Sequence, residues 1–418
     1  MECCEVCCEK INNSNHKKVE CPFCDLKSCR SCSQKYLVSI MEDPHCMGCK
    51  HEHNRELVDS YCSSTFRNVE FRKHREHILF EREKARLPET QPHVIRELRI
   101  RSLRTSYVYM YYILGQLEHT DEISERVKPL LREELRSAII LIYEELQVIA
   151  NINPGMNSEY VYTQKCPSDE CNGFLDENWD CEICSTSFCD KCHEELTINH
   201  KCDKDTVKTM KLLKRETRQC PKCSVPIYRI EGCAQIWCTQ CHVAFDWRTG
   251  RIETGRIHNP HYFEFKKRGR EHGDIPCGGR PSHRELRQIQ APYVIQLISL
   301  EVIRLDYDNT YRFGFTYDDN RLLRMKYILN EISEKEMKRE LQFRDKYNSK
   351  VTDIRDIYTM YTDTVGDLLR QYVLDTTIEN DILREVKELT SYTNNVIERI
   401  RSRYRCRVPH NIILEIDI

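Results

Sequence analysis

The residues of this chain with the clearest chemistry are cysteines in pairs of the form Cys-x2-Cys. Two thiolates separated by two residues bind one metal ion from a single tight turn, and two such turns complete a tetrahedral zinc site. Eight pairs occur, in three groups along the chain: Cys4/Cys7, Cys21/Cys24, Cys29/Cys32 and Cys46/Cys49; Cys181/Cys184 and Cys189/Cys192; Cys220/Cys223 and Cys238/Cys241. This spacing predicts several structural zinc sites.

The alternative use of 25 cysteines is a disulfide framework, which requires an oxidising compartment and is typical of short secreted chains. This chain has 418 residues, and its first ten, MECCEVCCEK, have neither a basic start nor an apolar stretch of a signal peptide. It contains no apolar run of about 18 residues that would span a membrane. We therefore expect zinc rather than disulfides, an intracellular reducing compartment and no membrane partner.

The charge balance of 64 basic against 66 acidic residues produces no strong field, so nucleic acid is not indicated as a partner. Only 13 Gly and 14 Pro occur, and no low-complexity linker marks a boundary. The length predicts about two to four domains, and cysteine density locates them.

The cysteine-free stretches have apolar residues spaced by three and four, which predicts helices whose apolar faces form the cores of helical bundles. These residues include Ile95, Leu98, Leu103, Val108, Tyr111, Tyr112, Leu130, Leu131, Leu135 and Ile139, then Leu322, Leu323, Ile328, Leu368, Leu369, Ile382 and Val386. The expected fold class is multidomain: small zinc-stabilised α+β modules combined with an all-helical spacer and an all-helical C-terminal region.

In the first group, pairs one and three can hold one ion while pairs two and four hold another. This interleaving resembles the cross-brace of a RING domain, with a FYVE or PHD finger as the alternative. Cys3 and Cys8 lie beside presumed ligands and could replace them. The RING resemblance implies that Val6 and Met47 dock a ubiquitin-conjugating enzyme, whereas local packing is the other explanation for their apolar character.

The second group reads Cys166-x4-Cys171-x9-Cys181-x2-Cys184-x4-Cys189-x2-Cys192 and closes with His200-x-Cys202. With Gly173-Phe174-Leu175 and Trp179, it resembles an in-between-RING domain, whose ligands are used in sequence order. The resemblance implies two zinc sites, one of Cys166, Cys171, Cys181 and Cys184 and one of Cys189, Cys192, His200 and Cys202. His193 could replace His200.

In the third group, Cys220, Cys223, Cys238 and Cys241 form a tetrad and leave Cys233, which follows Gly232. An inert buried thiol is one interpretation of Cys233. The segment also resembles the catalytic Rcat domain of RING-in-between-RING (RBR, or TRIAD) ubiquitin ligases, where the cysteine of the Gly-Cys pair is the nucleophile. The resemblance implies that Cys233 accepts ubiquitin as a thioester and passes it to an amine.

This chain departs from the Rcat pattern in two ways. Gln235 stands where many relatives have a histidine base, so His242 or a later histidine would serve, or the amine loses its proton without help. Asp246 and Thr249 replace two zinc ligands.

A rearranged second site is conceivable from Asp246, His258, His261 and Cys277, with surface histidines as the alternative. We therefore expect about five zinc ions, or six with the mixed site. The segment WCTQCHVAFDWRTGRIETGRIHNPHYFEF resembles the version encoded by giant nucleocytoplasmic DNA viruses, which implies a viral origin and the host cytoplasm.

The predicted domains are a RING-like module (1–62), a helical spacer (63–159), an in-between-RING module (160–204), a basic linker helix (205–219), an Rcat-like module (220–283) and a helical C-terminal domain (284–418). The spacer is expected to set the distance between the conjugating enzyme and Cys233. By placement, residues 285–418 resemble the autoinhibitory domain of ariadne-type ligases.

Three functions compete: a transthiolating ubiquitin ligase whose partners are a conjugating enzyme and ubiquitin, a catalytically silent zinc scaffold, and a nucleic-acid binder. The basic run Lys266, Lys267, Arg268 and Arg270 favours the last. Near-neutral overall charge disfavours it.

Overall fold

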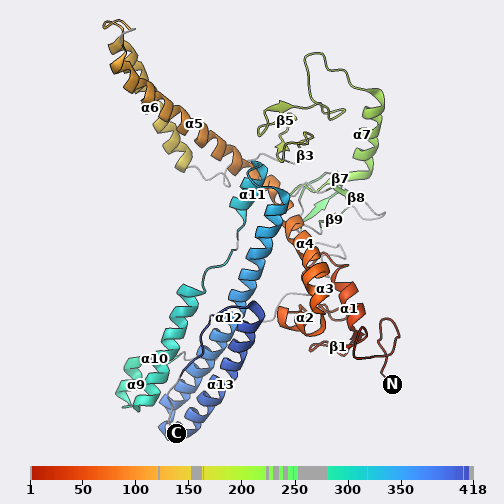
Figure 1. The fold of residues 1–418 in the computed structure, drawn as a ribbon, viewed down its shortest axis with the longest axis vertical. Coiled ribbons are helices and arrows are strands. Elements are labelled where there is room, and N and C mark those ends of the chain that lie inside the picture. Colours follow the sequence, from red (N-terminus) through yellow and green to blue (C-terminus); the bar gives the residue numbers. More distant parts are fainter. Residues whose placement is uncertain are drawn as a thin grey trace.

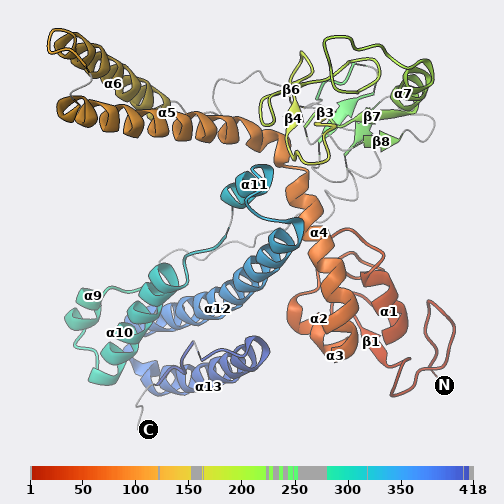
Figure 2. The same cartoon turned by 45° about the horizontal axis from the view of Figure 1, so that its top comes forward.

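The computed structural model describes residues 2–120, 123–151, 162, 164–222, 226–228, 235–238, 243–247, 249–252, 280–317, 319–407 and 409–413. Several regions radiate from one junction near the end of α4, as Figure 1 shows. The N-terminal module, a protruding pair of helices, the strand-containing modules and the C-terminal helices each leave this junction in a different direction (Figure 2).

The first module combines a small hairpin with two helices: β1 (Lys18–Glu20), β2 (Lys27–Cys29), α1 (Arg30–Leu37) and α2 (Arg55–Tyr61). Strands β1 and β2 pair antiparallel, with Val19 opposite Ser28. Val19, Leu37 and Tyr61 share a small apolar core. Helix α2 starts at Asn54, whose side chain accepts the Leu57 N–H at 2.9 Å. A core this small explains why metal ligands are needed to hold the loops around it.

The middle of the chain is helical: α3 (Ser64–Phe66), a π-helical turn (Arg67–Phe71), α4 (Arg72–Lys84), α5 (Leu87–His119) and α6 (Lys128–Asn151). Helices α5 and α6 form an antiparallel hairpin. At its base the Arg96 guanidinium donates to the carbonyls of Ile149 (3.1 Å) and Ala150 (3.0 Å). Helix α6 therefore returns toward the start of α5, so these two helices form a side arm, and the role of residues 63–159 as a spacer stays a prediction.

We call residues 102–119 of α5 together with α6 the arm. Leu103 and Ile139 are buried between its two helices, as the periodicity predicts. The prediction is wrong for Val108, Tyr112 and Leu130, which are 67%, 61% and 67% exposed; Tyr111 is exposed as well. Each helix of a two-helix hairpin can bury only the face that meets the other helix, and the arm carries apolar residues beyond that face.

The second module has the hairpins β3 (Gln164–Lys165) with β4 (Phe174–Leu175) and β5 (Asp180–Cys181) with β6 (Thr186–Ser187). Helix α7 (Lys204–Glu216) follows. The third module contains β7 (Thr217–Gln219), β8 (Pro226–Tyr228), β9 (Gln235–Trp237) and β10 (Ala244–Asp246). All four pairings are antiparallel.

The basic linker helix ends earlier than predicted. Residues 217–219 form β7, which pairs with β8 so that Thr217 lies opposite Tyr228 and Gln219 opposite Pro226. This hairpin leads directly into Cys220, so the chain needs extended backbone there to enter the turn that carries the cysteine.

The C-terminal region is helical: α9 (His283–Gln288), α10 (Tyr293–Tyr307), a π-helical turn (Asp308–Arg312), α11 (Arg321–Ile328), α12 (Glu334–Leu374), a 3-10 turn (Thr376–Ile378) and α13 (Glu379–Tyr404). Helices α10, α12 and α13 enclose one large apolar core that includes Ile298, Tyr361 and Ile397. Helix α12 begins with a capping box, because Ser333 and Glu336 each accept the other's backbone N–H.

The junction, which we call the hub, consists of residues 75–98 at the end of α4 and the start of α5. Ala85 packs against Cys220, Cys238 and Phe245 of the third module. Leu87 and Val94 pack against Phe174 of the second module and Ile328 of α11.

Polar contacts in the hub are also buried. The Gln91 amide donates to the Phe174 carbonyl (2.7 Å) and accepts the Phe174 N–H (2.6 Å). Arg324 of α11, 2% exposed, donates to Glu83 Oε2 (2.5 Å) and to Thr90 Oγ1 (2.7 Å). Each buried donor and acceptor thus has a partner from another region, which fixes how the regions meet.

Ion pairs connect the first module to the hub. Arg75 of α4 donates to Asp43 Oδ1 (2.5 Å) and to Asp345 on α12 (2.7 and 3.3 Å). Arg82 forms a second two-armed contact with Asp43, at 3.1 and 3.0 Å. The two arginines hold the pKa of Asp43 below its usual range, at about 2, against the opposing effect of burial.

The predicted fold class is confirmed: small cysteine-rich modules with two-stranded sheets are combined with helical regions. The domain limits stay predictions. In the part of the chain that the structure describes, none of the helices has the length and apolarity to cross a bilayer.

Candidate metal centres and catalytic segment

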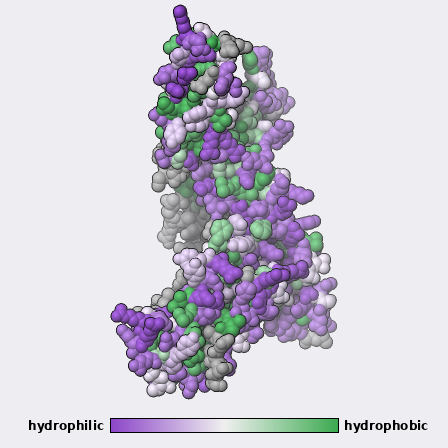
Figure 3. All heavy atoms as spheres, turned by 60° about the vertical axis from the view of Figure 1, so that its left-hand side comes forward, coloured by the Kyte–Doolittle hydropathy of each residue, from purple (hydrophilic) through white to green (hydrophobic). Residues whose placement is uncertain are grey.

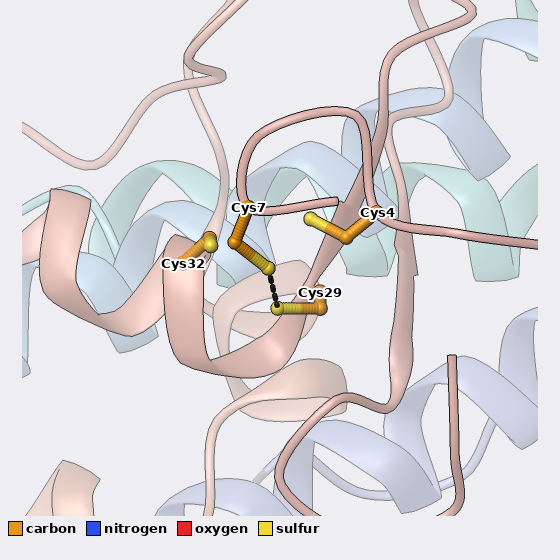
Figure 4. Close-up of side chains that lie close together, drawn as sticks. All are labelled: Cys4, Cys7, Cys29 and Cys32. Carbon is orange, nitrogen blue, oxygen red and sulfur yellow. Dashed lines mark hydrogen bonds between the residues drawn. The ribbon is translucent and has the colours of Figure 1, made fainter. Parts of the chain in front are cut away.

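The first module brings its eight predicted ligands together in two groups: Cys4, Cys7, Cys29 and Cys32, and Cys21, Cys24, Cys46 and Cys49. Within each group the sulfur atoms all lie within 4.8 Å of one another. The first group joins the N-terminal loop to the end of β2 and the start of α1 (Figure 4). Pairs one and three, and pairs two and four, therefore interleave in the arrangement that the spacing allowed.

The turns that carry the cysteine pairs share a local geometry. The first sulfur accepts the backbone N–H two residues on, from Val6 to Cys4 and from Gly48 to Cys46, each at 3.4 Å. The N–H of the residue after the pair then donates to the carbonyl of the first cysteine, as Lys50 does to Cys46 at 3.1 Å. This closing residue has a left-handed backbone, with φ of 62° at Lys50 and 57° at Ser185.

Two residues that the sequence allowed as alternative ligands occupy this closing position instead. Cys8 (φ 59°) and His193 (φ 63°) both occupy it, and neither belongs to a ligand group. The His193 ring instead lies against Trp179, with ring centroids 4.6 Å apart. Cys3 also lies outside the groups and is exposed.

The second module also forms two groups: Cys166, Cys171, Cys181 and Cys184, and Cys189, Cys192, His200 and Cys202. In the second group, His200 Nε2 lies within hydrogen-bonding distance of two sulfurs, 3.2 Å from Cys192 Sγ and 3.5 Å from Cys202 Sγ. The ligands are grouped in sequence order, with His200 rather than His193. The pattern therefore changes from interleaved in the first module to sequential in the second.

The distances within the groups fit zinc. A zinc–sulfur bond of about 2.3 Å places the sulfurs of a tetrahedron about 3.8 Å apart, whereas a disulfide holds them at about 2.05 Å. Sulfur–sulfur distances are 3.8 Å for Cys7–Cys29, 3.6 Å for Cys24–Cys46 and 3.7 Å for Cys171–Cys181. Thiols at these separations match the edges of a metal tetrahedron.

The electrostatics of the groups also favour a cation. Burial raises the pKa of the Cys166 thiol to about 12, while a hydrogen bond from Cys171 lowers that of Cys181 to about 5. Four neighbouring thiols therefore ionise unequally, because each new thiolate repels the next. A dication would stabilise all four thiolates at once.

The third module places Cys220 at the end of the β7 strand and Cys238 at the end of β9, both nearly inaccessible and in one cluster with Phe245. The β7–β8 hairpin and the β9–β10 hairpin thus each contribute one cysteine to the same buried cluster. The remaining predicted ligands Cys223 and Cys241, the proposed nucleophile Cys233, and the residues His242, His258, His261 and Cys277 lie outside the described residues, as does the basic run at 266–270.

Asp246 begins a turn with the shape of a cysteine knuckle. Its Oδ1 accepts the Thr249 N–H (2.7 Å), and its carbonyl accepts the Gly250 N–H (2.8 Å). Gly250 has φ of 76°, the left-handed backbone of the closing position. A Cβ on Gly250 would also lie 2.7 Å from the Arg218 guanidinium. The carbonyl bond matches that of the cysteine turns, whereas the carboxylate accepts the N–H three residues on rather than two. Asp246 as a metal ligand stays a prediction.

Two groups of residues around the first module were missed by sequence reasoning. His16 Nδ1 lies 3.3 Å from Cys29 Sγ, in position to donate to a ligand sulfur. Buried His45 lies 2.6 Å from the Tyr36 hydroxyl through Nε2 and 2.8 Å from the Asp43 carbonyl through Nδ1. The sequence does show a histidine close to cysteine pairs in each case, but the spacing of a histidine does not reveal which group it contacts.

No protein-family model matches the chain. Uncharacterized protein 073L of frog virus 3 is 29% identical over 96 residues, which are 22% of this chain and 30% of the viral protein.

Two other relatives are named as ligases. The E3 ubiquitin-protein ligase RNF217 of Mus musculus is 35% identical over 80 residues, 17% of this chain and 15% of the ligase. The probable E3 ubiquitin-protein ligase RNF144A-B of Danio rerio is 30% identical over 103 residues, 20% of this chain and 35% of the relative. The chain thus matches about a third or less of the length of these relatives. These partial matches, together with the interleaved and sequential cysteine groups, support the resemblance to the RING-in-between-RING family, and a frog virus protein is among the similar proteins.

Proposed function

We propose that this protein is a ubiquitin ligase of the RING-in-between-RING type, which accepts ubiquitin on Cys233 and transfers it to an amine. The observation that carries the proposal is the order of the ligand groups. An interleaved module is followed in one chain by a sequential module, and proteins similar to parts of this chain are named E3 ubiquitin-protein ligases.

The proposed reaction has two steps. The Cys233 thiolate attacks the thioester carbonyl of ubiquitin on the conjugating enzyme, a new C–S bond forms, and the enzyme's thiolate leaves with the electron pair of the broken bond. An amine then attacks the new thioester, the amide forms, and Cys233 leaves as thiolate while the amine gives up a proton. The first step is close to thermoneutral and needs only an accessible thiolate.

The proton of the second step needs an acceptor other than Gln235, because an amide is not basic at neutral pH. His242 or a later histidine is proposed for this role, and water is the alternative acceptor. Gln235 itself begins β9, with its Cα opposite that of Asp246.

Zinc, when bound, would supply fixed loops rather than reaction chemistry. The four groups with sixteen donors in the first two modules would hold it, and Cys220, Cys223, Cys238 and Cys241 are proposed to hold a further ion. His258, His261 and Cys277 stay proposed ligands of a mixed site.

The conjugating enzyme is proposed to dock on the two ligand loops of the first module. Val6 is 49% exposed in the first loop, whereas Met47 is partly buried and lines a small pocket together with Leu37 and Tyr61. Val6→Arg should abolish ubiquitin loading. Val69→Arg is the matched control, because Val69 is also 49% exposed but lies on the π-helical turn before α4. Equal loss of loading in both variants would exclude the docking role of Val6.

The test of the reaction is a thioester trap. The full chain is incubated with ubiquitin-charged conjugating enzyme and resolved on a non-reducing gel, where we expect a thiol-sensitive ubiquitin adduct that is lost in Cys233→Ala. Cys406→Ala is the control, because Cys406 follows α13 and belongs to none of the cysteine groups. An adduct that survives Cys233→Ala contradicts the proposal. Absence of an adduct from a zinc-loaded chain would favour a catalytically silent zinc scaffold. Salt-dependent retention on nucleic acid would favour a nucleic-acid-binding protein.

The C-terminal region is proposed to restrain loading. It contacts the first module where Glu56 of α2 accepts from Arg399 (3.2 Å) and Arg403 (2.9 Å) of α13. Deleting residues 285–418 would also remove Arg324 from buried Glu83, so Glu56→Arg is the cleaner variant. Loading should rise in Glu56→Arg, and unchanged loading with an intact fold would end the restraint hypothesis.

A further inference from the structure

Helix α6 has an exposed, partly apolar seam. Leu130, Leu141 and Val148 alternate with the polar residues Glu134, Ser137 and Glu144 at spacings of three and four, Val127 just before the helix continues the spacing, and all seven are exposed. Such a heptad spacing places residues on one side of a helix and is the pattern by which a helix packs on a second helix. The seam of α6 that packs on α5 is a different set, which includes Ile139.

Helix α5 adds an aromatic surface at the same end of the molecule. Val108, Tyr109, Tyr111 and Tyr112 are all at least half exposed. Between Ser102 and Leu117, Arg104 is the one charged residue of the sequence. Abundant tyrosine and few charges are typical of the centre of a protein interface. Figure 3 shows apolar residues at the surface of the arm, among polar ones.

The arm exposes many apolar and aromatic side chains. Nine contribute: Val108, Tyr109, Tyr111, Tyr112, Leu130, Ile140, Leu141, Tyr143 and Val148, each 50% to 67% exposed. They span more than one face, because Ile140 and Tyr143 lie about 100° and 160° around α6 from Leu141. A stable interface buries about 800 Å² on each partner, so a dimer formed by the arm would use side chains of both helices.

The charges of α6 are arranged for pairing with a copy of itself in the opposite direction. Residues 128–136 carry Lys128, Arg132 and Arg136 against Glu133 and Glu134, a net charge of +1. Residues 137–151 carry Glu144 and Glu145, a net charge of −2. Antiparallel pairing sets the positive half of each helix against the negative half of the other, whereas parallel pairing stacks like charges.

We infer that the arm is a homodimerisation element, in which α6 packs antiparallel on α6 of a second copy of this chain, with Ser137 near the two-fold axis. A serine at the crossing point lets the two helices approach closely. This register puts Val127 opposite Val148 of the second copy, Leu130 opposite Glu144 and Glu134 opposite Leu141, so no two carboxylates face each other. The two hairpins then form a four-helix arrangement in which Tyr109 and Tyr112 add to the buried surface.

The inference is independent of the chemistry proposed at Cys233 and is tested by mass. The full chain should sediment at twice its chain mass of 49.9 kDa over concentrations from about 1 to about 100 µM. Leu130→Glu combined with Leu141→Glu should raise the dimer dissociation constant at least about 100-fold, since each dimer receives four carboxylates in its interface. Leu374→Glu is the matched control, because Leu374 is 81% exposed at the end of α12 and should leave the dimer intact.

Two results would overturn the inference: a monomer over the whole range with normal helicity, or a dimer that the double variant leaves unchanged. Helicity by circular dichroism and zinc content exclude misfolding as the cause of a lost dimer. A second measurement fixes the register. Ser137→Cys treated with a short bismaleimide should yield a peptide crosslinked to itself at residue 137, and a self-crosslink confined to other cysteines would contradict the antiparallel pairing.

Discussion

The two halves of α5 have the same kind of sequence and opposite surroundings. In the hub half, Leu87, Val94 and Gln91 are covered by the second module and by α11. In the arm half, Val108 and Tyr112 remain exposed although their spacing is equally apolar. Helical periodicity therefore identifies an apolar face without saying whether one helix, several modules or a second chain covers it.

The halves also differ in how their polar groups are used. In the hub, charged and amide groups are buried and join regions that lie far apart in sequence, as Arg324 does with Glu83. At the base of the arm, Arg99 of α5 pairs with Glu145 of α6 at 2.6 Å, and both side chains are 40% or more exposed. A buried polar group that loses its partner is costly, whereas an exposed pair contributes little. Loss of a polar partner should therefore lower the free energy of unfolding strongly in the hub and only slightly in the arm.

Removal of metal should have the largest effect on stability, and it should separate the cysteine-rich modules from the arm. A structural zinc contributes about 10–16 kcal/mol of apparent folding free energy, so a chelator should unfold the first two modules. The arm holds no metal group among the described residues and should keep its helices. Hydrogen exchange measures both: amides near Cys29 and Cys181 should lose protection while those near Ile139 keep it. Equal loss in both places would show that the arm depends on the modules.

Replacing one partner of the buried ion pair should have the next largest effect. Glu83→Ala leaves the Arg324 guanidinium buried with one carboxylate fewer, which should cost about 3–5 kcal/mol in free energy of unfolding. Glu145→Ala in the arm removes an exposed pair and should cost less than about 1 kcal/mol. Denaturant unfolding followed by helix signal gives both values. Similar losses in the two variants would refute the distinction between hub and arm.

Two glutamines on α5 provide a comparison within a single helix. Gln91→Ala leaves the N–H and C=O of Phe174 buried without their partner, at a cost of about 1–3 kcal/mol. Gln116→Ala changes an exposed side chain of the arm and should lie within about 0.5 kcal/mol of the parent protein. Thermal unfolding measures the difference, and an effect at Gln116 as large as at Gln91 would show that the arm is buried in solution.

The smallest loss in free energy of unfolding is expected when Arg75 or Arg99 is replaced by alanine. Arg75→Ala breaks the contacts with Asp43 and Asp345 and should cost about 1–2 kcal/mol, because its side chain is 17% exposed. Arg99→Ala should cost less than about 0.5 kcal/mol. High salt should reduce the Arg99 effect further and leave most of the Arg75 effect. A stronger salt dependence at Arg75 would mean that its contacts are open to solvent.

The grouping of the cysteines in the first two modules could be predicted because their spacing fixes which sulfurs a tight turn can bring together. The groups in the first two modules have the predicted members, including His200. Gln91 and Arg324 could not be predicted, because a single polar residue in a helix carries no periodic signal of its partner. The exposure of Val108 was missed because the periodicity of one chain does not reveal the number of covering elements. The role of Asp246 as a turn-closing acceptor needed backbone geometry that composition does not encode.

The turn from Asp246 to Gly250 has a consequence under oxidative stress. Peroxide converts metal-bound thiolates to sulfenic acids and disulfides and thereby releases their zinc, but it does not attack a carboxylate. The hydrogen bond that the Asp246 carboxylate accepts at this turn therefore does not depend on the redox state, in contrast to the bonds accepted by the cysteine sulfurs in the turns of the first two modules.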